Sequence, residues 1–149
     1  MVAAGLCIER RPCDLAMTLV VAHEHGGDVY AVADSKVTAQ WSQQNPFVGH
    51  SRAKILWLSP QTAVAYAGDV DAAVSAITCI EQSKMERDSI LSFLQRVSGA
   101  GNTDFLWIDL ASSNKIVRIH DGAWTTGPSA WIGDAAAFDT FQHCYHGSP

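Results

Sequence analysis

Four residues in the first half of the chain have the types that an acyl-transfer site needs: Thr18, Asp34, Lys54 and Gly68. A threonine hydroxyl is a poor nucleophile, but an N-terminal threonine carries an α-amino group of pKa about 7.7–8.0 that can act as its base. A lysine cation nearby would lower the pKa of that amine, and an aspartate would hold the lysine in place. A glycine N–H could stabilise the oxyanion. The set is compatible with a threonine-dependent hydrolase only if Thr18 is N-terminal.

Each of these residues also has an ordinary structural interpretation. The alternatives are a strand threonine at Thr18, a strand-end cap at Asp34, a solvated strand residue at Lys54 and the start of a helix at Gly68. No one of the four predicts a function alone, so the hypothesis depends on their occurring together.

The composition predicts one domain with much of its surface covered. A chain of 149 residues and 16.0 kDa fits a single domain that can bury a core. Charged residues make up 17% of the sequence, below the roughly 25% typical of soluble domains, so another layer or other subunits should cover part of the surface. The net charge of −5 argues against a nucleic-acid partner.

Cysteine usage and hydropathy indicate a cytoplasmic protein. The four cysteines are scattered without a C-x-x-C pair, which predicts free thiols in a reducing compartment; they are Cys7, Cys13, Cys79 and Cys144. The N-terminus lacks the apolar core of a signal peptide, and no apolar run approaches the ~20 residues of a membrane span.

Two groups of metal-ligand types are present, but neither predicts a metal site. His23 and His25 alternate on one expected strand, and His143-Cys144-x-His146 lies near the end of the sequence. Neither has a second cluster at a standard spacing. The tryptophans form no cofactor motif, so we expect no cofactor.

The elements that would position the four residues follow from turn residues and hydrophobic period. A hairpin is expected over residues 18–34 around Gly26-Gly27, and a second over 54–67 around Ser59-Pro60-Gln61, buried on both faces. Residues 35–52 read as a loop. A four-three-four apolar spacing predicts a helix from about Val70 to Glu81, and a second helix should open at Asp88 or Ser89.

The rest of the chain completes an α+β pattern. Strands are expected over residues 104–110 and 115–120, an irregular stretch over 124–128, and a short helix over 134–143. Strands, then two helices, then strands and a helix favour antiparallel sheet. We expect two stacked sheets with helices outside, in one domain over residues 18–149 that follows a leader-like arm over 1–17.

At these positions the chain resembles the proteasome β-subunit family of N-terminal nucleophile (Ntn) hydrolases, including its bacterial HslV branch. The family has a nucleophilic threonine, an Ala-Asp pair sixteen positions on, a lysine at the next strand and a glycine fourteen positions later. Here Asp34 follows Thr18 by sixteen positions, and Gly68 follows Lys54 by fourteen. The run Ala-Asp-Ser-Lys-Val-Thr over residues 33–38 is similar to the family's Ala-Asp-Ser-Arg-Ala-Thr.

The resemblance implies an αββα sandwich of two antiparallel sheets flanked by helices. It also implies a threonine peptidase with Thr18 as nucleophile, Asp34 and Lys54 as its partners and Gly68 at the oxyanion. The implied partners are a peptide or unfolded-protein substrate, a homo-oligomeric ring and an ATP-dependent unfoldase. Residues 38–52 and the segment between Gly68 and Asp71 would set substrate preference.

Three features depart from the family pattern. Seventeen residues precede Thr18, and the residue before it is Met17 rather than glycine. Either Met17 is the initiator and its removal exposes Thr18, or the leader persists. Asp134 occupies the position of a supporting serine; it could accept a hydrogen bond from the amine, but its charge would raise the amine's pKa. The sequence also stops before the family's last helix and two strands, so either it is a fragment or the fold is shortened at the C-terminus.

These departures favour a competing hypothesis. A domain that keeps its leader, carries Asp134 and lacks the last strands could be a non-catalytic Ntn-fold module for assembly or partner binding. The identity of the N-terminal residue of the mature protein separates the two hypotheses.

Overall fold

The structure is a computed structural model, and it describes residues 18–34 and 53–146. The predicted leader over residues 1–17 and the predicted substrate loop over 38–52 lie outside the described residues.

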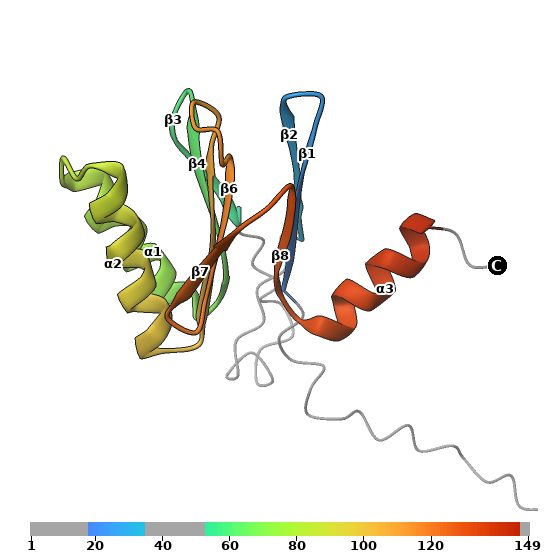
Figure 1. The fold of residues 1–149 in the computed structure, drawn as a ribbon. Helices are drawn as coiled ribbons and strands as arrows, with labels where there is room; N and C mark the ends of the chain where they lie inside the picture. The colour runs from blue at the N-terminus through green and yellow to red at the C-terminus, as the bar shows by residue number, and fades with distance from the viewer. Residues whose placement is uncertain (1–17, 35–52, 147–149) are drawn as a thin grey trace, which may run out of the picture.

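The described chain forms two antiparallel sheets and three helices (Figure 1), which confirms the predicted α+β class. The smaller sheet has the order β2-β1-β8, with strands β1 (Leu19–His25), β2 (Asp28–Ala33) and β8 (Ser129–Gly133). The larger sheet has the order β3-β4-β5-β6-β7, with strands β3 (Ile55–Ser59), β4 (Thr62–Gly68), β5 (Thr103–Asp109), β6 (Ile116–His120) and β7 (Ala123–Thr126). The helices are α1 (Val70–Gln82), α2 (Arg87–Ala100) and α3 (Ala135–His146).

The predicted first hairpin is confirmed as β1 and β2. Gly26 and Gly27 form its turn, and the two strands pair in register from Val20 opposite Ala33 to His25 opposite Asp28. β8 pairs with the other side of β1, so β1 is the central strand of the small sheet. β8, which is more than 100 positions away in the sequence, therefore lies beside β1 and close to Thr18.

Two apolar clusters hold the layers together. Helices α1 and α2 cover one face of the large sheet, where Tyr66, Phe105 and Leu94 are fully buried. The other face of the large sheet packs on the small sheet through a second cluster that includes Val20, Leu106 and Ile132. Figure 1 shows the helix pair and the small sheet on opposite sides of the large sheet, with α3 leading away from β8.

Helices α1 and α2 begin close to the residues that the spacing of apolar side chains predicted. Asp69 caps α1, since its carboxylate accepts hydrogen bonds from the N–H groups of Asp71 and Ala72. α2 begins at Arg87, one position before the predicted Asp88, with Glu86 as its N-cap residue.

Two strand predictions were wrong. Residues 124–128 were expected to be irregular, but residues 123–126 form β7, whose four residues are all exposed and so carry no alternating apolar signal. The second hairpin was expected to be buried on both faces. β4 is buried, but β3 is an edge strand, and its Trp57 is 61% exposed.

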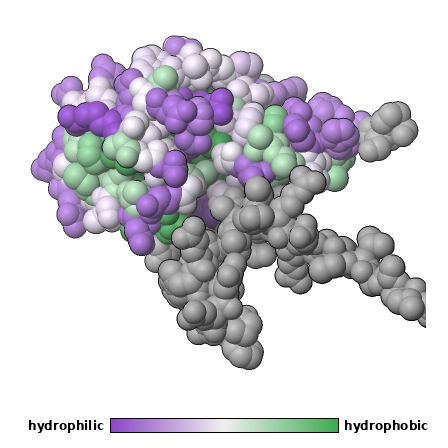
Figure 2. Space-filling model, turned by 90° about the horizontal axis from the view of Figure 1, so that it is seen from below, coloured by the Kyte–Doolittle hydropathy of each residue, from purple (hydrophilic) through white to green (hydrophobic). Residues whose placement is uncertain are grey.

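The described surface carries several exposed apolar side chains. The large ones are Tyr30, Val32, Trp57 and Trp124. Figure 2 views the molecule from the end at which β1 begins, and there hydrophobic residues reach the surface in separate areas divided by hydrophilic ones. Among the described helices, none is long and apolar enough to cross a membrane.

Candidate active site

The side chains of Thr18, Asp34 and Lys54 meet at one end of the two sheets. The Lys54 ammonium donates one hydrogen bond to Thr18 Oγ1 at 2.9 Å and another to Asp34 Oδ1 at 2.6 Å. Thr18 directly precedes β1, Asp34 directly follows β2 and Lys54 directly precedes β3. Lys54 therefore joins the large sheet to both strands of the first hairpin.

Burial makes these two acceptors important for Lys54. Its side chain is 1% exposed, whereas the side chain of Asp34 is 35% exposed. An ammonium group is costly to bury unless it is paired and hydrogen-bonded. The geometry fixes the nitrogen of Lys54 between a carboxylate and a threonine hydroxyl, which is where a cation would stabilise negative charge developing on that hydroxyl oxygen.

The second oxygen of Asp34 ties the site to the backbone of β1. Asp34 Oδ2 accepts a hydrogen bond from the N–H of Leu19 at 2.8 Å, and the N–H of Asp34 donates to the carbonyl of Leu19 at 3.1 Å. The carboxylate is thus held by the residue that follows Thr18. The pairing of β1 with β2 therefore fixes where the Asp34 carboxylate lies relative to Thr18.

Gly68 lies at the same end of the large sheet. The N–H of Tyr66 donates to the carbonyl of Lys54 at 3.1 Å, and Gly68 is two residues further along β4, a distance of about 7 Å along a strand. N–H groups alternate in direction along a regular strand, which would turn the N–H of Gly68 to the β3 side, the side on which the N–H of Tyr66 donates to Lys54. The φ of Gly68 is +101°, and a Cβ there would lie 1.8 Å from the carbonyl oxygen of Asn102, so only glycine fits.

Asp134 also reaches the site, but through its backbone. Its N–H donates to the carbonyl of Thr18 at 2.8 Å. Its carboxylate oxygen Oδ1 accepts a hydrogen bond at 2.9 Å from the N–H of Ala137 and so caps the first turn of α3. The sequence could not predict that the backbone N–H of Asp134 contacts Thr18 while its carboxylate contacts α3, because both contacts depend on the pairing of β8 with β1.

Sequence reasoning missed Gly133 as a site residue. It pairs with Leu19, has a φ of +111°, and packs directly against the backbone of Thr18. The available signal was a second Gly-Asp pair before a helix, at Gly133-Asp134, which repeats the arrangement at Gly68-Asp69.

The histidine groups lie apart from this site. His23 and His25 stack on each other at 6.4 Å between ring centroids, and His23 Nδ1 contacts Ser129 Oγ at 2.5 Å. Within residues 18–34 and 53–146, no group of three His, Cys, Asp or Glu side chains could hold a metal ion.

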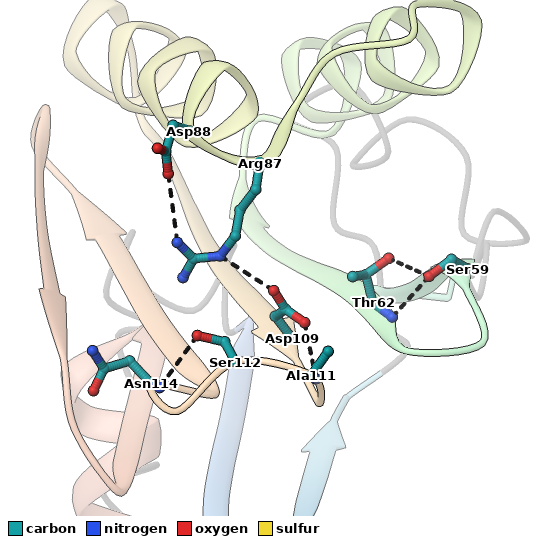
Figure 3. Close-up of polar contacts among 8 residues, drawn as sticks. All are labelled: Ser59, Thr62, Arg87, Asp88, Asp109, Ala111, Ser112 and Asn114. Carbon is teal, nitrogen blue, oxygen red and sulfur yellow. Dashed lines mark hydrogen bonds and ion pairs between the residues drawn. The ribbon is translucent and has the colours of Figure 1, made fainter.

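A second set of polar contacts occupies the opposite end of the sheets. There Lys115 Nζ donates to Glu24 Oε1 at 3.1 Å and to the carbonyl of Gly27 at 2.8 Å, which again joins the two sheets. Figure 3 shows Arg87 reaching Asp109 from the start of α2. These residues hold elements together: Lys115 and Arg87 donate here to carboxylates and to a backbone carbonyl, whereas Lys54 donates to a carboxylate and a threonine hydroxyl.

Comparisons with known proteins place the fold but not the family. No family model matches this chain, and a comparison with curated proteins found no match. Among solved structures, the chain is similar to the crystal structure of eukaryotic HslV from Trypanosoma brucei, with a TM-score of 0.60 and 14% sequence identity. The match covers 78% of this chain and 72% of that chain. At this identity the likeness shows the fold alone, so the fold is HslV-like.

Proposed function

We propose that this chain is a subunit of a proteasome-like threonine peptidase, with Thr18 as the nucleophile once the preceding residues are removed. One observation carries the proposal: the buried ammonium of Lys54 lies 2.9 Å from Thr18 Oγ1 and 2.6 Å from Asp34 Oδ1. A lysine that served only to join the sheets would not need the hydroxyl of the threonine that directly precedes β1. The HslV-like fold supports the same reading.

The proposed reaction uses the α-amino group of Thr18 as the base. The amine takes the hydroxyl proton as Oγ1 attacks the substrate carbonyl, and the N–H of Gly68 stabilises the oxyanion. The C–N bond then breaks, the leaving amine takes the proton, and an ester of Thr18 remains. Water hydrolyses that ester with the same amine as base. Lys54 stabilises charge on Oγ1, and Asp34 positions Lys54.

The reaction requires a free N-terminus at Thr18, because an amide nitrogen is not basic. Removal of the leader over residues 1–17, or initiation at Met17 followed by methionine removal, would supply it. The domain over residues 18–149 would then be an αββα sandwich. It would act in the cytoplasm on peptide or unfolded-protein substrates, in a homo-oligomeric ring served by an ATP-dependent unfoldase.

Asp134 supports a competing proposal. One oxygen of its carboxylate caps α3, and a carboxylate stands where the family pattern has a supporting serine. A non-catalytic Ntn-fold module for assembly or partner binding would fit this feature and a retained leader. Thr18 and Lys54 would then form only a structural contact.

The decisive experiment starts with the intact mass of protein expressed from its natural start. A species that begins at Thr18 should hydrolyse fluorogenic peptides and be labelled by a threonine-directed electrophile. Thr18→Ala should abolish both, while Thr18→Ser keeps a hydroxyl and should retain measurable hydrolysis. Unchanged hydrolysis in Thr18→Ala would exclude the mechanism, and a mature protein that never begins at Thr18 would favour the non-catalytic module.

A further inference from the structure

An N-terminal nucleophile presents a structural problem, because terminal residues tend to fray unless they are tied down. Thr18 is held through its hydroxyl by Lys54 at 2.9 Å. Its carbonyl is held separately by the N–H of Asp134 at 2.8 Å. The hydroxyl contact alone would not hold the peptide group that joins Thr18 to Leu19. That peptide is fixed from two sides, because its N–H donates to Asp34 Oδ2 at 2.8 Å and its carbonyl accepts from Asp134, so the Asp134 contact completes the orientation of Thr18.

The close approach behind that second contact requires Gly133. Its φ of +111° lies in the region that favours glycine. A Cβ built at Gly133 would lie 1.8 Å from the carbonyl oxygen of Thr18 and 2.7 Å from the carbonyl carbon. The obstacle is backbone, so a side chain at this position must displace either β8 or Thr18.

Asp134 connects this contact to α3. Its carboxylate caps the helix through the N–H of Ala137, and its carbonyl accepts the N–H of Phe138 at 3.0 Å. The ring of Phe138 stacks on Trp131 of β8, with 4.4 Å between centroids and 10° between planes. The direction of the Asp134 N–H is therefore fixed on one side by β8 and on the other by the first turn of α3.

We propose that Gly133 and Asp134 are positioning residues that orient Thr18 for attack: Gly133 allows β8 to approach, and the Asp134 N–H holds the Thr18 carbonyl. The carboxylate of Asp134 acts one step further away, by fixing α3. This inference rests on the proposed function, since it assigns the orientation to a nucleophile. It differs from a direct role for the Asp134 carboxylate at the amine.

The test uses protein that begins at Thr18 and a readout independent of hydrolysis. Lys54 is nearly inaccessible while it contacts Thr18, so its acylation by an amine-reactive reagent, mapped by mass spectrometry, reports displacement of Thr18. Gly133→Ala should raise the Lys54 acylation rate about tenfold through local opening. It should also lower kcat about 100-fold with little change in KM, since misplacement affects the reacting geometry more than binding.

Gly122→Ala is the matched control. Gly122 also has a positive φ, +72°, and a Cβ there would lie 3.2 Å from Gly99 Cα in α2. This variant should lose stability but keep Lys54 protected and kcat unchanged. A folded Gly133→Ala protein with wild-type Lys54 protection and kcat would overturn the inference.

Asp134 variants cover the case in which Gly133→Ala fails to fold. Asp134→Ala keeps the backbone N–H but removes the cap, and should raise Lys54 acylation by about twofold to threefold through a looser α3. Asp134→Ser restores a capping oxygen and should restore protection. Equal protection in the alanine and wild-type proteins would contradict the link to α3.

The outcomes also separate this inference from the proposed function. If Gly133→Ala exposes Lys54 but wild-type protein beginning at Thr18 hydrolyses nothing, the contact holds Thr18 in place and the peptidase proposal fails. If the wild type hydrolyses peptides and Gly133→Ala behaves identically in both assays, only the positioning inference fails.

Discussion

Two lysines join the sheets of this protein, one at each end, and they do so in different ways. Lys54 is 1% exposed in its side chain and donates to a carboxylate and a threonine hydroxyl. Lys115 is 17% exposed and donates to Glu24 and to the carbonyl of Gly27. Both bridge the same pair of sheets, so a need to hold the sheets together does not explain why one is buried against a hydroxyl.

The two lysines differ in the free energy needed to remove each ammonium from water and in the groups that each one contacts. The Lys115–Glu24 pair is partly open to solvent, and such pairs contribute less to stability than their geometry suggests, whereas a fully buried ammonium is tolerated only with well-placed acceptors. Lys115 thus joins the sheets at a hairpin tip with a small loss of hydration. Lys54 is the connection whose burial places a positive charge against a reactive group, and variants at the two positions test whether that charge has a chemical use.

The largest expected effect is on catalysis. In protein that begins at Thr18, Lys54→Met should lower kcat/KM for peptide hydrolysis about 1,000-fold, because it removes the cation beside the attacking oxygen. Lys115→Met removes the same group at the other end and should leave kcat/KM within about twofold. Steady-state kinetics on both variants measure the contrast. Equal losses would mean that the two lysines have the same structural role.

The next effect is on stability. Lys54→Met leaves Asp34 without its ion pair in a partly buried site and should lower the free energy of unfolding by about 2 kcal/mol. Urea denaturation followed by circular dichroism provides the measurement. A more stable Lys54→Met protein, with activity lost, would be the strongest sign that Lys54 is kept for function.

A smaller effect is expected at the structural end of the molecule. Arg87 donates to Asp109 at 3.2 Å, and the side chain of Asp109 is 11% exposed. Arg87→Met should cost about 1 kcal/mol of stability and leave Lys54 protected from acylation. Asp88→Asn is the control, because Asp88 is 96% exposed and lies 3.6 Å from Arg87, so no measurable loss is expected. A rise in Lys54 acylation in Arg87→Met would show that the two ends are coupled.

The smallest effect concerns salt. The stability difference between wild type and Lys115→Met should be about 0.5 kcal/mol at low ionic strength and should shrink in 0.5 M NaCl, about three times the physiological ionic strength. The difference for Lys54→Met should shrink less, because the Lys54 ammonium itself is 1% exposed even though its partner Asp34 is 35% exposed. Denaturation curves at both salt concentrations test this, and equal salt dependence would contradict the assigned burial.

Local patterns in the sequence predicted much of the fold. The Gly26-Gly27 turn predicted the first hairpin, and apolar spacing predicted α1 and α2. The exposed strand β7 was missed because it lacks alternation, and the pairing of β8 with β1 was not predictable from local pattern, since the partners lie about 110 positions apart.

In the candidate site, too, some features were predictable from the sequence and others depended on distant contacts. The intervals between Thr18, Asp34, Lys54 and Gly68 pointed to one place, and the structure brings the first three into contact. The catalytic roles remain predictions. The contacts of Asp134 could not be foreseen, because a residue type does not say whether its side chain or its backbone N–H will face a neighbour.

The Gly26-Gly27 turn has a practical consequence for anyone purifying or labelling this protein. An affinity tag at the amino terminus would block the very group that the proposed chemistry needs. At both glycines a Cβ would meet nothing within 4 Å, and the seven residues of β1 separate the turn from Thr18 by about 23 Å. A short epitope inserted between the two glycines, with the Gly27 carbonyl left for Lys115, would therefore give a handle that leaves the first residue of the mature chain untouched.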